Sequence, residues 1–254
     1  MLTLYHYWSS VCSQKVRFCL CEKELDWKSH HLDLNTFDHW RPEYLRLNRN
    51  AVVPTLDHDG HIVIESNVII EYLEDSFPED SFPEVPLRPE NPYLRAQMRH
   101  WIYRSQADAH SAVARCSYNL RHRPRLLQKY SIEEIRKIAQ GHPNPVMRAG
   151  MVQRAEKGVS TEQEAAAYRV LATLVDLMEE SLAESPWLAG DGFSLADVAM
   201  APYVNRIEVL AHPEILASNV HPRVAGWWSR VQERPAFKAA FSFANPDTSD
   251  PIKR

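Results

Sequence analysis

Five prolines crowded between residues 76 and 92 divide this chain into two parts with different sequence patterns. Proline fixes φ and removes a backbone donor, so it is excluded from helix interiors and central strands, and this segment is predicted to be a linker. We therefore expect a first domain over residues 1–80, a proline-rich linker over 81–91 and a second domain over 92–254. The length of 254 residues gives each domain enough chain to bury its own core.

The first part alternates between strand-like and helix-like patterns. Aromatic and β-branched residues predict strands, and Asp59-Gly60 marks a hairpin turn because both positions tolerate positive φ. The pattern predicts a strand over 2–8, a helix over 15–23, a strand over 27–34, a polar loop over 35–50, hairpin strands over 52–57 and 61–65, and a helix over 66–74 that Ser66 can cap. This order, βαβ followed by ββα, predicts an α/β domain.

The second part has only helical patterns. Apolar residues recur at helical spacing over 93–114 and 162–182, and further helices are expected from Ser194 and over 220–232. Two of these helices begin with a capping box, one formed by Ser160 with Gln163 and the other by Ser194 with Asp197. The fold class is therefore α/β plus all-α, and the last dozen residues are expected to be loosely held.

Charge and residue spacing argue against several classes of function. The formal net charge of −4 is unlike that of a nucleic-acid binder, whose affinity rests on cations that neutralise phosphates. No apolar run approaches the roughly 18 residues of a membrane span, and the N-terminus lacks the pattern of a signal peptide.

Twelve scattered histidines predict no metal site, and the basic cluster 121–125 is predicted to be a solvated loop. Four cysteines form no disulfide framework, so a cytoplasmic protein is expected.

Three local features carry the chemistry. In the turn Ser9–Ser13 after the first strand, a hydroxyl at a helix N-terminus can donate to a thiolate and lower the pKa of a bound thiol, although N-capping alone also accounts for it. A cis bond before Pro54 would present the main chain of Val53 to an extended peptide. Glu65 and Ser66 begin the next predicted helix, where they can cap it or hold the charged end of an amino acid. Together these features fit a single ligand, a peptide that carries a thiol.

The chain resembles the glutathione transferase superfamily over nearly its whole length, on the ordered motifs SSVCSQKVR, VVPTL, IESNVIIEYLE, the proline-rich linker and FSLADV. The resemblance implies a thioredoxin-like domain that binds glutathione, an all-helical domain that lines the electrophile site, and a homodimer. It also implies that Val53 and Pro54 hold the cysteinyl part of glutathione and that Glu65 and Ser66 hold its γ-glutamyl end. The capping box at Ser194 would serve folding.

The resemblance leaves several candidates for the residue that activates the glutathione sulfur. SSVCSQKVR is similar to the zeta-class motif with Ser10 in the catalytic position, whereas delta- and theta-class motifs point to Ser9. Bacterial β-etherases, which the chain also resembles in EYLEDSFPE, RAQMRHW and GFSLADV, point to Ser13. We rank Ser10 first, then Ser13 and Ser9. Cys12 is a secondary candidate, as a nucleophile that forms a mixed disulfide.

One departure from the family pattern concerns Val52, which stands where the family often has a Gln or Lys that contacts glutathione. Val52 offers only its main chain, so the glycyl carboxylate of glutathione must find another partner. His39, Trp40 and Arg49 are the candidates for that role.

The first long helix of the second part is expected to line the electrophile pocket, because it does so in the family. The candidate pocket residues on it are Trp101, Tyr103, His110 and Tyr118. The predicted activity is attack of the glutathione thiolate on an apolar, aromatic electrophile, with β-aryl ether cleavage as one form. The alternatives are a glutathione-dependent isomerase or thiol transferase, and a non-catalytic binding module.

Overall fold

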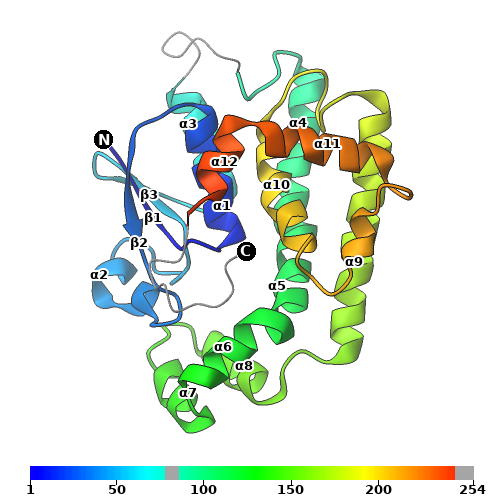
Figure 1. The fold of residues 1–254 in the computed structure, drawn as a ribbon. Coiled ribbons are helices and arrows are strands. Elements are labelled where there is room, and N and C mark those ends of the chain that lie inside the picture. Colours follow the sequence, from blue (N-terminus) through cyan, green and yellow to red (C-terminus); the bar gives the residue numbers. More distant parts are fainter. Residues whose placement is uncertain (78–85, 244–254) are drawn as a thin grey trace.

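A mixed four-stranded sheet forms the centre of the first part of the chain (Figure 1). The computed structural model describes residues 1–77 and 86–243. The strands are β1 (Leu2–His6), β2 (Trp27–His31), β3 (Thr55–His58) and β4 (His61–Ile64), in the spatial order β2-β1-β3-β4. β1 is parallel to β2 and antiparallel to β3, and β3 is antiparallel to β4. This is the predicted thioredoxin-like order, and positive φ at Asp59 and Gly60 confirms the hairpin turn.

Three helices accompany the sheet. They are α1 (Val11–Glu22), α2 (Pro42–Leu45) and α3 (Ser66–Ser76), with a short 3₁₀ turn at Asp38–Trp40. α1 begins four residues before the predicted start, because Ser10 caps it and the polar residues at its start are already helical. Residues 35–50 are not one irregular loop as predicted, since the 3₁₀ turn and α2 lie within them. Ser66 is the first residue of α3 and not its cap, a position that Glu65 occupies.

The rest of the described chain is helical, as predicted (Figure 1). Its helices are α4 (Pro92–Arg104), α5 (Ser111–Ser117), α6 (Arg123–Lys129), α7 (Ile132–Ala139), α8 (Pro145–Lys157), α9 (Thr161–Glu184), α10 (Leu195–Ile207), α11 (Pro222–Glu233) and α12 (Pro235–Phe241). Two π-helical segments, Ser105–His110 and Tyr118–His122, join α4, α5 and α6 into one continuous helical stretch, so the predicted helix over 93–114 continues well beyond its expected end. A 3₁₀ turn, Pro213–Leu216, precedes α11.

Both predicted capping boxes form. The Ser160 hydroxyl accepts from the N–H of Gln163 and the Gln163 side chain accepts from the N–H of Ser160. Ser194 and Asp197 make the same exchange at the start of α10. Asp197 is fully buried and also accepts hydrogen bonds from the N–H of Leu188 at 3.1 Å and the indole of Trp227 at 2.8 Å. This carboxylate therefore fixes α10, α11 and the preceding loop together.

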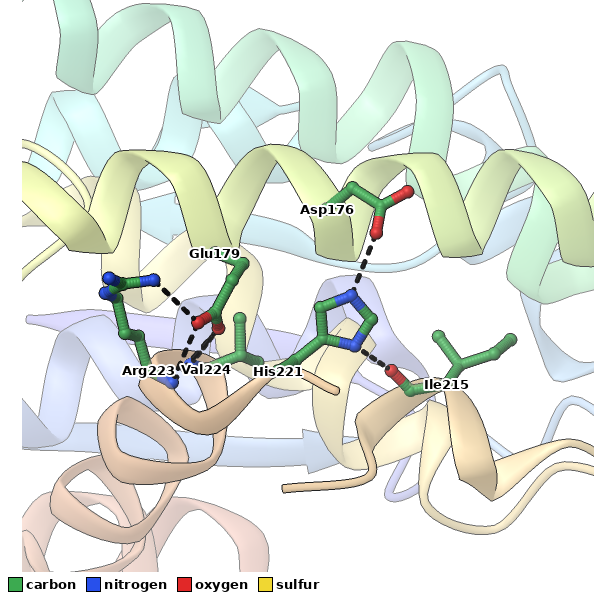
Figure 2. Close-up of polar contacts among 6 residues, drawn as sticks. All are labelled: Asp176, Glu179, Ile215, His221, Arg223 and Val224. Atoms are coloured by element: carbon green, nitrogen blue, oxygen red, sulfur yellow. Dashed lines mark hydrogen bonds and ion pairs between the residues drawn. The ribbon is translucent and has the colours of Figure 1, made fainter. Parts of the chain in front are cut away.

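A carboxylate on α9 caps the start of α11 from outside that helix (Figure 2). Glu179 accepts from the main-chain N–H groups of Arg223 and Val224, at 3.0 and 2.9 Å, which the helix itself leaves unpaired. One turn earlier on α9, Asp176 lies 2.8 Å from the imidazole of His221, whose other nitrogen lies 2.8 Å from the carbonyl of Ile215. The two contacts set the position of α11 on α9.

One hydrophobic core joins the two parts of the chain. In Figure 1, α1 and α12 lie between the sheet and the helices α4 and α10. Phe18 of α1 packs edge-on against Phe193, Phe237 and Phe241, with ring centroids 5.8 to 5.9 Å apart. Residues 81–85 of the predicted linker over 81–91 lie outside the described residues, and 86–91 form neither helix nor strand. All but the first of the final dozen residues also lie outside the described residues, so the boundaries at 80 and 91 stay a proposal. Within the described residues, no helix is both long and apolar enough to cross a bilayer.

Candidate active site

The peptide bond between Val53 and Pro54 is cis. The residues before it are fixed by Tyr44 and Asn48, whose hydroxyl and amide both donate to the carbonyl of Val52. The N–H and C=O of Val53, by contrast, make no hydrogen bond to any described residue. Because buried main-chain groups are almost always paired, the main chain of Val53 is suited to pair with an extended ligand.

Ser10 is the N-cap of α1. Its Oγ accepts a hydrogen bond from the N–H of Ser13 at 3.3 Å, so capping uses a lone pair and leaves the hydroxyl proton available to a second partner. Ser13 itself is fully buried, and its Oγ accepts from the N–H of Tyr7. Ser9 is buried too, and its carbonyl accepts from Arg206 at 2.6 Å.

Glu65 and Ser66 lie at the N-terminus of α3. Glu65 has φ 70° and ψ 112°, a conformation that costs a non-glycine residue roughly 1–3 kcal/mol and often marks a functional site. Its side chain is exposed and makes no capping bond, so the N-terminal N–H groups of α3 can receive an anion. Ser66 is buried beside Cys12.

These features share one cavity of about 430 Å³, which we call the peptide cavity. Its lining residues come from the start of α1, the segment after β2, the segment before β3, the start of α3 and the π-helical segment Ser105–His110. They are Ser10, Cys12, Leu34, His39, Asn50, Ala51, Val52, Val53, Pro54, Glu65, Ser66, Gln106 and His110. The structure therefore brings together most of the residues expected to bind glutathione, although they come from four separate stretches of sequence.

A second cavity, of about 360 Å³, adjoins the first, and we call it the electrophile cavity. Ser10, Leu34 and His110 line both cavities. The remaining lining residues are Tyr7, Ser9, Val11, Asn35, Phe37, Val113, Ala114, Ser117, Tyr118, His122, Leu126, Met151, Arg154 and Arg206. Apolar side chains from the helical half thus face the hydroxyl at the start of α1.

Several residues expected at the site lie away from both cavities. Trp101 is buried in the core and Tyr103 is 67% exposed, so neither lines the electrophile cavity, whereas His110 and Tyr118 do. Trp40 and Arg49 do not line the peptide cavity, and Trp40 packs instead against His142. On a helix, neighbouring side chains point in different directions, and sequence spacing alone does not fix which one faces a cavity.

Cys12 and His110 form a close polar pair at the boundary of the two cavities. The Cys12 Sγ lies 3.5 Å from His110 Nδ1 and 4.0 Å from the hydroxyl of Tyr203. Burial raises the pKa of the Cys12 thiol, but the hydrogen bond and charge of His110, with the charge of Lys15, outweigh it and lower this pKa to about 7. The same hydrogen bond raises the pKa of His110 against the opposing effect of burial. The geometry suits a thiolate paired with an imidazolium.

Lys15 supplies a buried positive charge beneath this pair. Its Nζ donates to Asn67 at 2.5 Å and to Ser105 at 3.0 Å, and it lies 5.3 Å from the ring centroid of Tyr203. Burial lowers the pKa of Lys15 to about 8, against the raising effect of Cys12 and Glu65. A cation held here stabilises any thiolate at the start of α1.

Comparison with known proteins agrees with this geometry. Residues 4–81 match the N-terminal domain of the glutathione S-transferase family, and residues 157–228 match the C-terminal domain. The protein LigF of Sphingobium sp. strain SYK-6 is 30% identical over 243 residues, which cover 94% of this chain and 93% of LigF. The chain belongs to the glutathione S-transferase superfamily. Its fold is accordingly the glutathione transferase fold, and the family's co-substrate is glutathione.

The structure and further relatives support the same assignment. The crystal structure of the β-etherase LigF is similar with a TM-score of 0.86 and 30% identity, and covers 94% of this chain and 98% of that one. A maleylacetoacetate isomerase from Pseudomonas aeruginosa is 27% identical and covers 97% of this chain and 99% of its own. A tetrachloro-p-hydroquinone reductive dehalogenase from Sphingobium chlorophenolicum is 25% identical, covering 94% and 95%. These relatives are named for different reactions.

The residues that sequence reasoning missed come from long-range packing. Gln106 faces the peptide cavity, and Phe37, Met151, Arg154 and Arg206 face the electrophile cavity. Met151 and Arg154 lie on α8, for which no helix was predicted, although Asn144 followed by Pro145 was an available start signal. No local pattern marks the other residues as cavity residues.

Proposed function

We propose that this protein is a glutathione transferase in which Ser10 activates the glutathione sulfur for attack on an apolar, aromatic electrophile. The observation that carries the proposal is that Ser10, with Leu34 and His110, lines both cavities. Among the described residues, no others line both cavities. A tripeptide in the peptide cavity would then have its sulfur near Ser10, where the two cavities meet. Ser9 lines only the electrophile cavity, and Ser13 lines neither.

Each end of glutathione has a partner in this arrangement. The main chain of Val53 would pair with the cysteinyl residue as an added strand, and the N-terminus of α3 with Glu65 and Ser66 would hold the γ-glutamyl end. His39 would donate to the glycyl carboxylate, since its Nδ1 is buried without a partner among the described residues. Burial, with the nearby His142, lowers the pKa of His39 to about 4, so this donor acts as the neutral imidazole.

The reaction is a nucleophilic substitution. The Ser10 hydroxyl donates to the sulfur and favours the thiolate, which attacks carbon as the carbon–sulfur bond forms and the bond to the leaving group breaks. We include the cleavage of a β-aryl ether, in which a phenolate leaves and takes up a proton, because the relative LigF is named a β-etherase. A chromogenic aryl ether that releases a coloured phenol would report this activity directly.

The test of the proposal compares Ser10→Ala with Ser13→Ala and Ser9→Ala. We expect Ser10→Ala to lower kcat/KM for conjugation by about 100-fold, since one donor to a developing or bound anion is commonly worth that much. The ultraviolet absorbance of bound thiolate, followed against pH, should show a raised thiol pKa in Ser10→Ala alone. A large loss in Ser13→Ala with full activity in Ser10→Ala would transfer the role to Ser13.

Thiol transfer is a second candidate function, and the contact between Cys12 and His110 favours it. In this reaction the Cys12 thiolate attacks a mixed disulfide of glutathione and releases the other thiol. A second glutathione thiolate then attacks the Cys12–glutathione disulfide, which yields oxidised glutathione and restores Cys12. Cys12→Ala should abolish this exchange and leave conjugation intact. Ser10→Ala should lower conjugation and leave the exchange intact.

A broad electrophile panel separates the remaining alternatives. Isomerisation would convert substrate without net consumption of glutathione, and a binding module would retain glutathione without turnover of any compound. We also propose that the protein is cytoplasmic, since the reaction needs reduced glutathione and all four cysteines are free. The proposal that it is a homodimer rests on its membership of the glutathione transferase superfamily. Light scattering at micromolar concentration tests the dimer, and a mass equal to one chain would refute it.

A further inference from the structure

The lining of the electrophile cavity combines apolar and basic side chains. The apolar ones include Leu34, Phe37, Val113, Leu126 and Met151. The basic ones, which we call the positive wall, are Arg154, Arg206 and His122, and no Asp or Glu of the described chain lines the cavity. This positive wall is local, because the protein as a whole has a formal net charge of −4.

The positive wall is built into the fold. Arg206 is 6% exposed at the end of α10 and donates through Nη2 to the carbonyl of Ser9, so it lies directly behind the start of α1. Burial lowers the pKa of His122 to about 4, helped by the charges of Arg206, Arg125 and Arg121, which shows that several cations lie together here. A neutral His122 then acts as a polar partner and not as a further charge.

The sequence analysis gave these basic residues a different role. The cluster 121–125 was predicted to be a solvated loop, but it spans the end of a π-helical segment and the start of α6, and Arg121 is 6% exposed. Arg123 binds the carbonyls of Ala155 and Glu156 and thereby attaches this segment to α8, the helix that carries Arg154. The cluster thus forms part of the cavity's support.

Two polar groups at the same cavity have no partner within the described chain. The guanidinium of Arg154 makes no hydrogen bond or ion pair there, and Arg154 is exposed and lines the cavity. The hydroxyl of Ser117 is buried without a hydrogen-bond partner, and Ser117 is only 2% exposed. Buried hydroxyls are normally paired, so an unpaired one in a cavity wall is suited to a ligand atom.

We infer that the electrophile carries a carboxylate on an apolar body, with Arg154, Arg206 and Ser117 as the groups that bind the carboxylate. This inference rests on the proposed function, since it assigns the substrate class of the same site. The planar guanidinium of Arg matches a carboxylate with two parallel donors. The apolar lining residues and the hydroxyl of Ser10 are then available to the part of the molecule that reacts.

The test of substrate class uses matched electrophiles, 4-(chloromethyl)benzoate and 4-(chloromethyl)benzamide, each corrected for its uncatalysed reaction with glutathione. We expect kcat/KM to be about tenfold higher for the carboxylate, because charge-assisted bonds exceed neutral ones while the exposure of Arg154 limits the gain. Equal or higher values for the amide would overturn the inference and leave the proposed function standing.

The variant Arg154→Gln tests the residue, and Lys157→Gln on the same helix is the matched control, since Lys157 is exposed and lines neither cavity. Both remove one positive charge from α8. Arg154→Gln should remove the preference by lowering kcat/KM for the carboxylate more than for the amide, while Lys157→Gln should keep the preference. Loss of the preference in both variants would attribute it to general charge and refute the assignment to Arg154.

Binding without glutathione separates failure of this inference from failure of the proposed function. Biphenyl-4-carboxylate should bind about tenfold more tightly than biphenyl-4-carboxamide by calorimetry, and Arg154→Gln should equalise them. If no electrophile turns over but this difference remains, the proposed function fails and the anion site stands. If the two compounds bind equally to the unaltered protein, the anion site is refuted.

Discussion

Cys12 shows how its neighbours can reverse the usual effect of burial on a thiol. Cys19, two turns further along α1, is fully buried, and burial raises its thiol pKa well above the ordinary value. Burial also raises the pKa of Cys116, to about 11. Cys12 differs because His110 lies 3.5 Å away and Lys15 adds a second positive charge. Reactivity should therefore be confined to one of these three cysteines.

We predict that Cys12 is alkylated by iodoacetamide with a pH midpoint near 7, and that His110→Asn lowers its rate at pH 7 by about tenfold. The sign follows from the thiolate being the nucleophile: removal of the imidazolium raises the thiol pKa, so less thiolate is present at neutral pH. Peptide mapping by mass spectrometry after timed alkylation measures the rate at each cysteine. An unchanged midpoint in His110→Asn would show that another group ionises Cys12.

At single residues, the sequence predicted the site residues whose place follows from the order of motifs. It missed the side-chain directions that depend on how the helices pack. Val53, Glu65 and Ser66 line one cavity as expected, because each stands at the end of an element whose place in a thioredoxin-like order is known. The direction of Tyr103, which is exposed, depends on how α4 is rotated about its axis. That rotation is set by contacts with α10 and by the hydrogen bond from Asn67 of α3 to the carbonyl of Ile102.

Among the elements, α11 depends on α9 for the satisfaction of its first N–H groups. Glu179 accepts from the N–H groups of Arg223 and Val224, and the side chain of Arg223 donates to the same carboxylate. The N-terminus of α11 has no side-chain cap of its own, since His221 at the cap position makes none. The unpaired N–H groups at the start of α11 are therefore satisfied by a side chain from a different helix, α9.

We expect Glu179→Ala to lower the free energy of unfolding by about 1–3 kcal/mol, because two partly buried N–H groups lose a charged acceptor. The adjacent Glu180 is exposed and makes no hydrogen bond or ion pair with α11 in the described chain, so Glu180→Ala is the matched control and should change stability by less than about 0.5 kcal/mol. Urea unfolding followed by circular dichroism measures both values. Equal effects of the two variants would remove the capping role from Glu179.

The elements that the sequence predicted are those with strong periodicity or a capping box. α9 has both and α10 begins with a capping box, and their starts fall within one residue of the predicted positions. α7 was missed although Ser131 and Glu134 form a capping box of the same kind and Ile132, Ile135 and Ala139 recur at helical spacing, so both signals were available in the sequence. α8 was missed because only Ala155 of its residues is fully buried, so it has almost no apolar face.

At the scale of the whole molecule, the two parts share a core that neither could complete alone. Phe18 of α1 contacts three aromatic rings from the helical half, and Arg234 makes two hydrogen bonds of 2.6 Å with Glu22 at the end of α1. The active site lies at the same junction, because His110 and Arg206 reach the start of α1 from the helical half. Fold and site therefore depend on one interface.

This shared core predicts that the protein unfolds in one cooperative step and that Phe18→Ala destabilises both halves together. Phe18 is fully buried, and the loss of a buried phenyl ring commonly costs about 3–5 kcal/mol, through lost burial and the cavity left behind. Hydrogen exchange measured by mass spectrometry in increasing urea reports each half separately. Peptides from β1 and from α10 should lose protection at the same urea concentration in the unaltered protein, and at the same lower concentration in Phe18→Ala. If β1 opened first while α10 kept its protection, the two halves would be independent folding units, and their contact through α1 would be a surface and not a core.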